Sequence, residues 1–358
     1  MPQRTRSDSS EKKSDRHARS KGTVNALKKH ANIPVFIPHF GCPNDCVFCN
    51  QRKISGVSCY DAEAVKNTID SALRTDRLGG GDTQIAFFGG SFTGIPRGEM
   101  MYLLELAKGY IDRGEVSSVR LSTRPDYIDA EILDILERYG VRTVELGIQS
   151  ASDEVLSLCR RGHTRADSER AMREVAARGF ELVGQMMTGL PGSTAETELE
   201  TAKLIADCGA SAARIYPTVV FTDTALYSMA VSGEYTPLTA DEHVKRAASV
   251  LEYFLSRGVG VIRIGLQAGE ALINRDGVYG CYDESVGEKC YGEYFGKLIA
   301  LSLAGHDVRG KRVVIHVGRG EASRAAGYRG KNKKALAEAG ASSVRIIEDS
   351  DRLRTELL

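Results

Sequence analysis

GCPNDCVFCN, residues 41–50, places Cys42, Cys46 and Cys49 at C-x3-C-x2-C spacing. The apolar run Ile33–Ile37 precedes it and is typical of a strand, so the three cysteines are predicted to lie on the loop that follows. Three thiolates on one short loop are soft ligands that suit an iron–sulfur cluster. Four irons with three protein ligands leave one iron open to a small molecule. A zinc loop is the alternative, but Cys59 is the only other cysteine nearby and nothing pairs with it.

Composition sets broad limits. A chain of 358 residues, 42% hydrophobic and 27% charged, is long enough for one large domain with an appendage. A net charge of +1 argues against nucleic-acid binding through the overall field, so any such contact must come from local patches. Neither a long apolar run nor a secretory signal is present. Eight cysteines without paired spacing outside the motif favour a reducing, cytoplasmic location.

The chain from residue 31 to about 270 alternates β-rich apolar runs with amphipathic helical stretches, such as Ala62–Leu73 and Thr164–Arg178, the second of which is predicted to be capped by Thr164 with Asp167 three residues on. The runs are Ile33–Ile37, Gln84–Phe88, Val119–Ser122, Thr143–Ile148, Leu182–Met187, Ala213–Val220 and Val259–Ile264. Repeated strand–helix units predict an α/β fold with a parallel sheet, although periodicity alone does not separate an open sheet from a barrel. In either case ligands bind at the carboxyl ends of the strands, where the polar motifs fall.

The two ends of the chain have a different character. Residues 1–30 are basic and poor in apolar side chains, which predicts a disordered tail. Residues 271–358 are predicted to form a small α+β extension, with an irregular stretch over 276–296, strands at 312–317 and 343–347, and a helix near 332–339. The two cysteines of this extension, Cys281 and Cys290, are too few for a second cluster.

Five strings carry a family resemblance: IPVFIPHFGCPNDCVFCNQ (33–51), FFGGSFTGI (87–95), LSTRPDYID (121–129), VELGIQS (144–150) and RRGHT (160–164). In this order they resemble the radical SAM core of the Elongator catalytic subunit and its bacterial relatives. The resemblance implies a partial (β/α)6 TIM-like barrel and a [4Fe-4S] cluster on Cys42, Cys46 and Cys49. It also implies that the open iron binds S-adenosylmethionine (SAM) and that reductive cleavage yields a 5′-deoxyadenosyl radical. A reductant such as flavodoxin or ferredoxin is implied as a partner.

Two strand ends carry candidate cofactor-binding groups. Gly89 and Gly90 let the backbone approach a ligand closely. The superfamily commonly has G-G-E here for the SAM amino group, and this chain has Ser91, which keeps the backbone contact and loses the carboxylate. Ser122 and Arg124 suit hydrogen bonds to a ribose or a carboxylate, the alternative being a capped turn with a surface arginine.

Further candidates lie on the next two strands. Glu145 and Gln149 share one strand face because side chains alternate, and a buried carboxylate there calls for a partner or ligand. The resemblance assigns Gln149 to a SAM hydroxyl or carboxylate, Arg161 to the SAM carboxylate and Gln185 to the ribose. A surface role is the alternative for Arg161, and His163 more often has a capping or structural role.

The substrate hypothesis is RNA, most directly tRNA. The loop Arg309–Lys334 gathers nine Lys and Arg residues against Glu321, which suits phosphate contacts, although a solvated basic loop is the alternative. Arg329 stands where an acetyl-CoA loop requires glycine, so we expect the radical SAM core without the acetyltransferase domain. Two alternatives stay open: an enzyme acting on a small molecule such as a porphyrin, like the coproporphyrinogen oxidases, and a cluster-bearing RNA-binding protein without catalysis.

Overall fold

The computed structural model describes residues 30–37, 46–49, 61–75, 82–266, 272 and 274–358. The predicted tail over residues 1–30 therefore lies almost wholly outside the described residues, as does Cys42.

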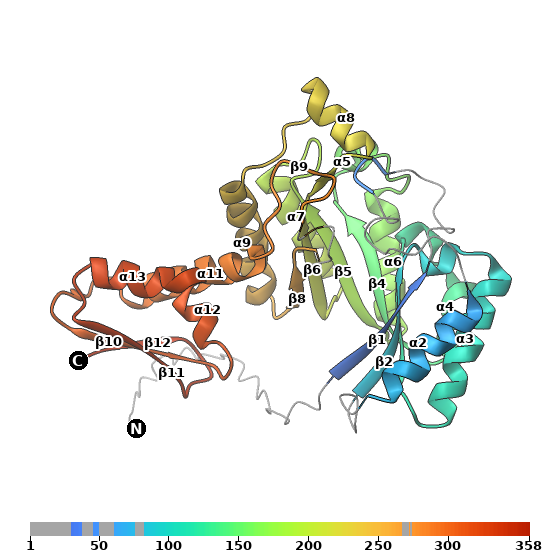
Figure 1. The fold of residues 1–358 in the computed structure, drawn as a ribbon, viewed down its shortest axis with the longest axis horizontal. Coiled ribbons are helices and arrows are strands. Elements are labelled where there is room, and N and C mark those ends of the chain that lie inside the picture. The colour runs from blue at the N-terminus through green and yellow to red at the C-terminus, as the bar shows by residue number, and fades with distance from the viewer. Residues whose placement is uncertain (1–29, 38–45, 50–60, 76–81, 267–271, 273) are drawn as a thin grey trace, which may run out of the picture.

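One parallel sheet forms the body of the molecule (Figure 1). Its strands stand in the order β1-β2-β3-β4-β5-β6-β8, and every neighbouring pair is parallel. The bounds are β1 His30–Ile37, β2 Asp82–Gly89, β3 Ser118–Thr123, β4 Val141–Gln149, β5 Glu181–Thr188, β6 Ala212–Pro217 and β8 Gly260–Ile264. The predicted α/β half-barrel is confirmed: each of the seven apolar runs overlaps a strand of this sheet, one strand more than the six-stranded barrel that the resemblance implied.

Helices cover the outer face of this sheet (Figure 1). They are α2 Ala62–Leu73, α3 Arg97–Asp112, α4 Ala130–Arg138, α6 Arg165–Ala177, α7 Ala195–Asp207 and α9 Ala240–Ser256. Each presents an apolar stripe to one large core that also contains the outward-facing side chains of the strands, such as Val119, Leu146 and Ile215. The inner face of the sheet is thereby left for polar groups and ligands.

Local sequence signals define where several helices begin. The predicted cap at Thr164 is confirmed: its hydroxyl accepts a hydrogen bond from the Asp167 backbone N–H, and Asp167 accepts one from the Thr164 N–H in return. Thr194 and Thr239 form the same reciprocal arrangement at the starts of α7 and α9. Such caps fix the point at which each strand-end loop becomes a helix.

Short elements surround the carboxyl ends of the strands. They are the 3-10 turns η3 Phe92–Gly94 and η4 Pro125–Tyr127, the helices α5 Asp153–Leu158 and α8 Ala225–Ser232, and the strands β7 Val220–Phe221 and β9 Val278–Tyr279. The run predicted as one strand over 213–220 is split, because β6 ends at Pro217 and β7 pairs antiparallel with β9 instead. These elements build the rim of the half-barrel.

The C-terminal part forms a smaller unit beside the barrel (Figure 1). It contains α11 Val286–Ser302, β10 Arg312–Val317, α12 Ala322–Ala326, η5 Tyr328–Gly330, α13 Lys331–Glu338, β11 Ser343–Glu348 and β12 Arg354–Leu357. β10 pairs parallel with β11 and antiparallel with β12. The irregular stretch predicted over 276–296 was wrong from Val286 onward, where α11 begins and packs against α9 and β8.

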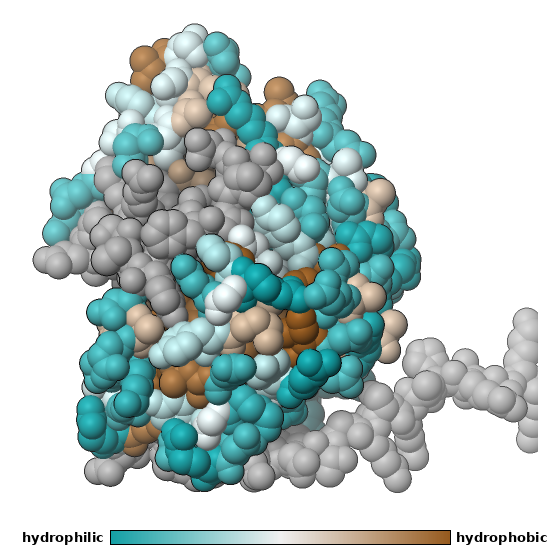
Figure 2. All heavy atoms as spheres, turned by 90° about the vertical axis from the view of Figure 1, so that its right-hand side faces the viewer, coloured by the Kyte–Doolittle hydropathy of each residue, from teal (hydrophilic) through white to brown (hydrophobic). Residues whose placement is uncertain are grey.

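The surface is mainly polar. Figure 2 shows hydrophilic residues predominating on one side of the barrel, with small apolar groups between them. Within the described residues, none of the helices combines the length and apolar character needed to cross a membrane.

Candidate active site

Two of the three motif cysteines lie within the described residues. Cys46 is buried and Cys49 is half-buried, and the Cys49 N–H donates to the Cys46 carbonyl over 2.9 Å, so a tight turn joins them. The Arg161 guanidinium lies next to this turn, with Nη1 3.6 Å from Cys46 Sγ. Two sulfurs and an adjacent cation form a donor set that suits an anionic iron–sulfur cluster.

Segments distant in sequence hold this turn. The Val47 N–H donates to the Cys159 carbonyl over 3.1 Å, and the Val47 carbonyl accepts from the Leu226 N–H over 2.8 Å. The Val47 side chain is buried in a small apolar cluster with Cys159, Leu190 and Leu226. The turn is thus fixed between the end of α5 and the start of α8, a contact that the sequence analysis missed.

Close backbone approach requires a glycine at Gly89, the last residue of β2. Gly89 has φ of +110°, and a Cβ there would lie 2.4 Å from the Ile37 carbonyl oxygen at the end of β1. The Gly90 N–H donates to the same oxygen over 3.3 Å. Ser91 is buried and precedes η3. The predicted Gly-Gly turn therefore joins the strand that leads into the cysteine motif to the neighbouring strand.

Replacing Gly89 by alanine is expected to lower the free energy of unfolding by about 3 kcal/mol, from the positive φ and the forced backbone displacement. A Cβ at Gly98, in the first turn of α3, would meet no other atom within 4 Å. Gly98→Ala should instead leave stability unchanged or raise it by about 0.5 kcal/mol. Urea unfolding followed by circular dichroism compares the two variants, and equal midpoints would contradict the close-approach argument.

Arg124 and Arg161 form a connected pair rather than two isolated surface arginines. Arg124 is 1% exposed and makes a two-point ion pair with Asp126, at 2.8 and 2.9 Å. Its Nη2 also donates to the Arg161 carbonyl over 2.6 Å. Arg161 Nη2 donates to the Gly147 carbonyl over 2.8 Å. The surface-arginine alternative is wrong for both residues, while their predicted contacts with SAM stay predictions.

The end of β4 offers groups that a cofactor would satisfy. Gln149 has φ of +66° and is 5% exposed, and its Oε1 has no hydrogen-bond partner within the described residues. A Cβ at Gly147 would lie 2.8 Å from Arg161 Nη2 and 3.0 Å from Gln149 Nε2. A buried acceptor without a partner, beside a glycine and an arginine, fits a polar cofactor with a carboxylate and hydroxyls.

Glu145 is engaged on the inner face of the sheet. Its Oε1 accepts from Arg120 Nη1 over 2.7 Å, and its Oε2 accepts from Arg214 Nε over 2.8 Å. Glu145 is 2% exposed, so this is a buried ion triad linking β3, β4 and β6. The buried position confirms the expectation that this carboxylate needs a partner, and two arginines supply it; its predicted contact with the cofactor stays a prediction.

Other predicted residues lie on the same inner face. Ser122 and Gln185 are both half-buried there, and Gln185 stands in register between Gly147 and Arg214. The sequence analysis missed Arg120, although the alternation of Ser118, Arg120 and Ser122 along β3 carried the signal.

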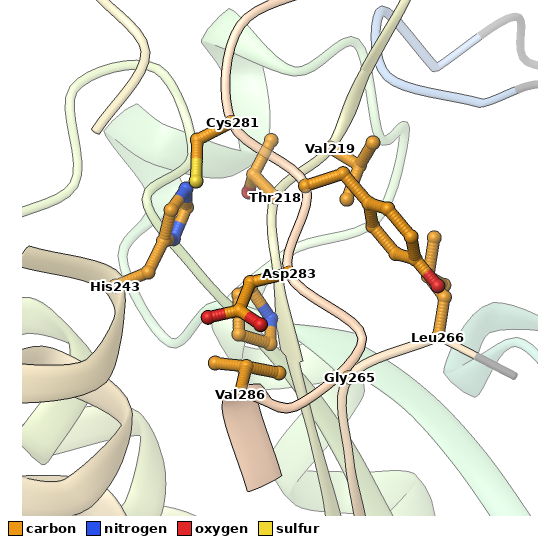
Figure 3. Close-up of a pocket in the computed structure, with 10 residues that line it drawn as sticks. Thr218, Val219, His243, Gly265, Leu266, Cys281, Asp283 and Val286 are labelled. Atoms are coloured by element: carbon orange, nitrogen blue, oxygen red, sulfur yellow. The ribbon is translucent and has the colours of Figure 1, made fainter. Parts of the chain in front are cut away.

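A small pocket opens where β6 and β8 end (Figure 3). It encloses about 20 Å³ between Pro217, Gly265, His243 and Cys281, which is room for one or two water molecules and far too little for SAM. The His243 Nδ1 and Tyr282 hydroxyl are buried without partners among the described residues. This pocket is therefore not the SAM site; no group of three His, Cys, Asp or Glu in the described part of the chain is arranged to hold a metal.

Two buried histidines are neutral in the folded protein. Burial, with the nearby Arg161 charge, lowers the pKa of His163 to about 4, and its Nε2 lies 3.3 Å from the Ile148 carbonyl. Burial, with Arg246, lowers the pKa of His243 to about 4. His163 thus has the structural position that its place before α6 indicated.

These two histidines predict acid sensitivity. Because their folded pKa values lie below the unfolded value of about 6.5, the unfolded chain binds more protons between pH 6.5 and 4, and stability falls as the pH drops. We expect a loss of about 1 kcal/mol per histidine at pH 5.5 relative to pH 7.5. Urea titrations at both pH values measure it. His163→Asn should reduce the pH dependence, and the same change at exposed His306 should not; equal slopes in all variants would contradict it.

The basic C-terminal loop differs in part from the expectation. All nine cationic side chains of residues 309–334 are exposed, but Asp307 pairs with Arg309 and Glu293 pairs with Lys331, so Glu321 is not the only carboxylate involved. The Ala322 N–H donates to Glu348, and the Gly318 N–H donates to Glu321. Carboxylates thus accept the hydrogen bonds of these two backbone N–H groups. Phosphate contacts in this loop would therefore be made by side chains.

Comparison with known proteins gives consistent matches. Residues 36–205 match the radical SAM superfamily model and residues 210–289 match the radical SAM C-terminal domain. An uncharacterized protein of Methanocaldococcus jannaschii is 30% identical over 237 residues, covering 63% of this chain and 72% of the relative. The tRNA uridine(34) acetyltransferase of Methanocaldococcus infernus is 34% identical over 128 residues, covering 35% of this chain and 24% of that protein.

A solved structure supports the fold. The Methanocaldococcus infernus Elp3 with an N-terminal deletion superposes with a TM-score of 0.59 at 21% identity, covering 76% of this chain and 64% of that one. The match thus spans most of the uncharacterized relative but only about a quarter of the acetyltransferase.

Proposed function

The chain belongs to the radical SAM superfamily, and we propose that this enzyme modifies RNA, most directly tRNA. A [4Fe-4S] cluster and SAM are its cofactors. When bound, they supply a 5′-deoxyadenosyl radical that abstracts hydrogen from a substrate. Cys42, Cys46 and Cys49 would hold the cluster. The observation that carries the tRNA proposal is the 34% identity to the tRNA uridine(34) acetyltransferase over 128 residues.

The residues at the strand ends would position SAM. We assign backbone contacts to Gly89, Gly90 and Ser91, and side-chain contacts to Ser122, Arg124, Glu145, Gln149, Arg161 and Gln185. Gln149 Oε1 is the best-supported of these acceptors, because it is buried and lacks a partner within the described residues. Arg161 would hold both the Cys46 sulfur and an anionic group of the cofactor in place, since its guanidinium already lies between β4 and the cysteine turn.

The C-terminal unit would contact the RNA backbone through side chains. Lys311, Lys333 and Lys334 are exposed and make no ion pair with another described residue. Phosphate contacts of this kind make affinity depend on salt. An external reductant such as flavodoxin or ferredoxin would supply the electron, and we place the enzyme in the cytoplasm, where thiols stay reduced.

The test is anaerobic incubation with SAM, dithionite and bulk tRNA, followed by quantification of 5′-deoxyadenosine and nucleoside mass spectrometry. We expect tRNA to stimulate release and to acquire a new modification. A Lys311/Lys333/Lys334 triple alanine variant should lower the slope of log affinity against log salt by about 2, whereas alanine at exposed Lys66 should not. Turnover of a small molecule without any tRNA dependence would replace the proposal with the small-molecule alternative.

A further inference from the structure

The inner face of the half-barrel carries more positive than negative charge. Three arginines, Arg120 on β3, Arg214 on β6 and Arg263 on β8, lie on this face, and Glu145 pairs with the first two. Because Arg214 and Arg263 are paired in register on adjacent parallel strands, their side chains share one face of the sheet. These three arginines are called the arginine wall. One carboxylate for three guanidinium groups leaves the arginine wall with an excess of two positive charges.

Glu145 is already shared between two of the three arginines. It already accepts three N–H groups, one from Arg120 and two from Arg214, at 2.7, 2.8 and 3.2 Å. Arg120 Nε also donates to Gln84 Oε1 over 3.0 Å, so Arg120 is held by two neighbouring strands. The Arg120 and Arg214 side chains are only 7% and 11% exposed, which makes uncompensated charge at this place costly.

Arg263 is the arginine that remains available. It is half-buried on edge strand β8, and no ion pair or hydrogen bond engages it within the described residues. Tyr216 follows Arg214 by two residues on β6 and so shares its face, and the charges of Arg214 and Arg263 both act on its phenol. Burial raises the pKa of Tyr216, so its phenol keeps a proton that it can donate.

Two phenylalanine rings lie next to these arginines. The Arg214 guanidinium lies 5.7 Å from the Phe88 ring centre, and Phe88 and Phe36 lie 6.4 Å apart at a tilted angle. Phe36 is 39% exposed on the inner face of β1, a large apolar side chain left uncovered where a ligand would lie. An oxyanion on the arginines and a flat apolar group over the phenylalanines would satisfy both features.

We propose that Arg263, Arg214 and Tyr216 form a binding site for an oxyanion of the substrate, with Glu145 and Arg120 as positioning residues. A forked guanidinium pair and a phenol donor match phosphate or carboxylate oxygens. This deepens the proposed function: with tRNA as substrate, the oxyanion is a phosphate of the modified nucleotide. With a small-molecule substrate it is a carboxylate or a phosphate ester.

Calorimetry of the anaerobically reconstituted enzyme with SAM, and without reductant, tests the site. Uridine monophosphate should bind at least about tenfold more tightly than uridine, because the phosphate adds charge-assisted hydrogen bonds. Arg263→Gln should remove most of this difference while leaving uridine affinity unchanged. Tyr216→Phe should reduce it by a smaller factor. Arg257→Gln is the matched control, since Arg257 is exposed and pairs with Asp207 over 2.8 Å on the outer face.

Malonate distinguishes the two sources of the oxyanion. If malonate binds in a manner that depends on Arg263 and uridine monophosphate does not bind, the result would support the site and assign it to a carboxylate. The site is overturned if neither anion responds to Arg263→Gln while circular dichroism shows the variant folded. Failure of the tRNA proposal gives a different result. In that case tRNA would not stimulate 5′-deoxyadenosine release, while anion binding would still depend on Arg263.

Discussion

Alanine in place of Cys46 is expected to remove the iron–sulfur cluster and to reduce 5′-deoxyadenosine formation by more than about 100-fold. Changes to residues that only orient metal ligands already cost 10–100-fold, so loss of a ligand should cost more. Cys46 is buried, and its sulfur lies 3.6 Å from the Arg161 guanidinium. Iron and sulfide content, absorbance at about 400 nm and SAM cleavage measure the effect.

Cys290 provides the matched control for this substitution. It is also buried, but it lies in α11, where its sulfur donates to the Val244 carbonyl over 3.6 Å. Cys290→Ala should retain the full iron content and activity, with at most a modest loss of stability. If the Cys46 variant kept its cluster, or if the Cys290 variant lost it, the assignment of the motif as the metal site would fail.

Glu145→Gln is expected to lower the free energy of unfolding by about 3 kcal/mol or more, because it leaves two buried guanidinium groups without their counter-charge. The change keeps the size of the side chain, so the effect isolates the charge. The melting temperature should fall by several degrees. Glu169→Gln is the comparison: Glu169 pairs with Arg173 on the exposed face of α6, and its loss should cost less than about 0.5 kcal/mol.

Added phosphate or sulfate offers a second test of the same substitution. An oxyanion that binds the arginine wall would restore part of the stability lost in the Glu145 variant, through the usual coupling of binding to folding. Thermal shifts in sulfate and in chloride at equal ionic strength measure this. If the Glu145 variant were as stable as the wild type in chloride, the arginines would not need the Glu145 charge for stability, and the prediction would be wrong.

Local signals made much of the barrel predictable. The strand runs, the Thr164–Asp167 cap and the Gly-Gly turn are each decided by neighbours in sequence, and the structure has them where they were expected. α2 begins and ends at the predicted residues, Ala62 and Leu73, since its apolar positions repeat with helical spacing.

The missed features depend on contacts between distant segments. Glycines at 287, 292 and 296 made α11 look irregular, but a Cβ at Gly292 would lie 3.2 Å from Gly327, and one at Gly296 would lie 2.7 Å from Asn332. These glycines allow close packing of a helix that their intrinsic propensity disfavours. Likewise, the partners of Glu145 lie 25 and 69 residues away, so its shared face with Gln149 was predictable and its ion triad was not.

The hydrogen bond between Leu226 and Val47 also bears on how this enzyme can be divided. The two family models meet near residue 210, yet the backbone of the cysteine turn is held by a donor from the second of them. A fragment ending at that boundary would keep every cysteine of the motif and lose one wall of the turn. The halves are therefore not interchangeable modules, and a chimaera that exchanges them between relatives would have to recreate the α8 contact before it could hold its metal.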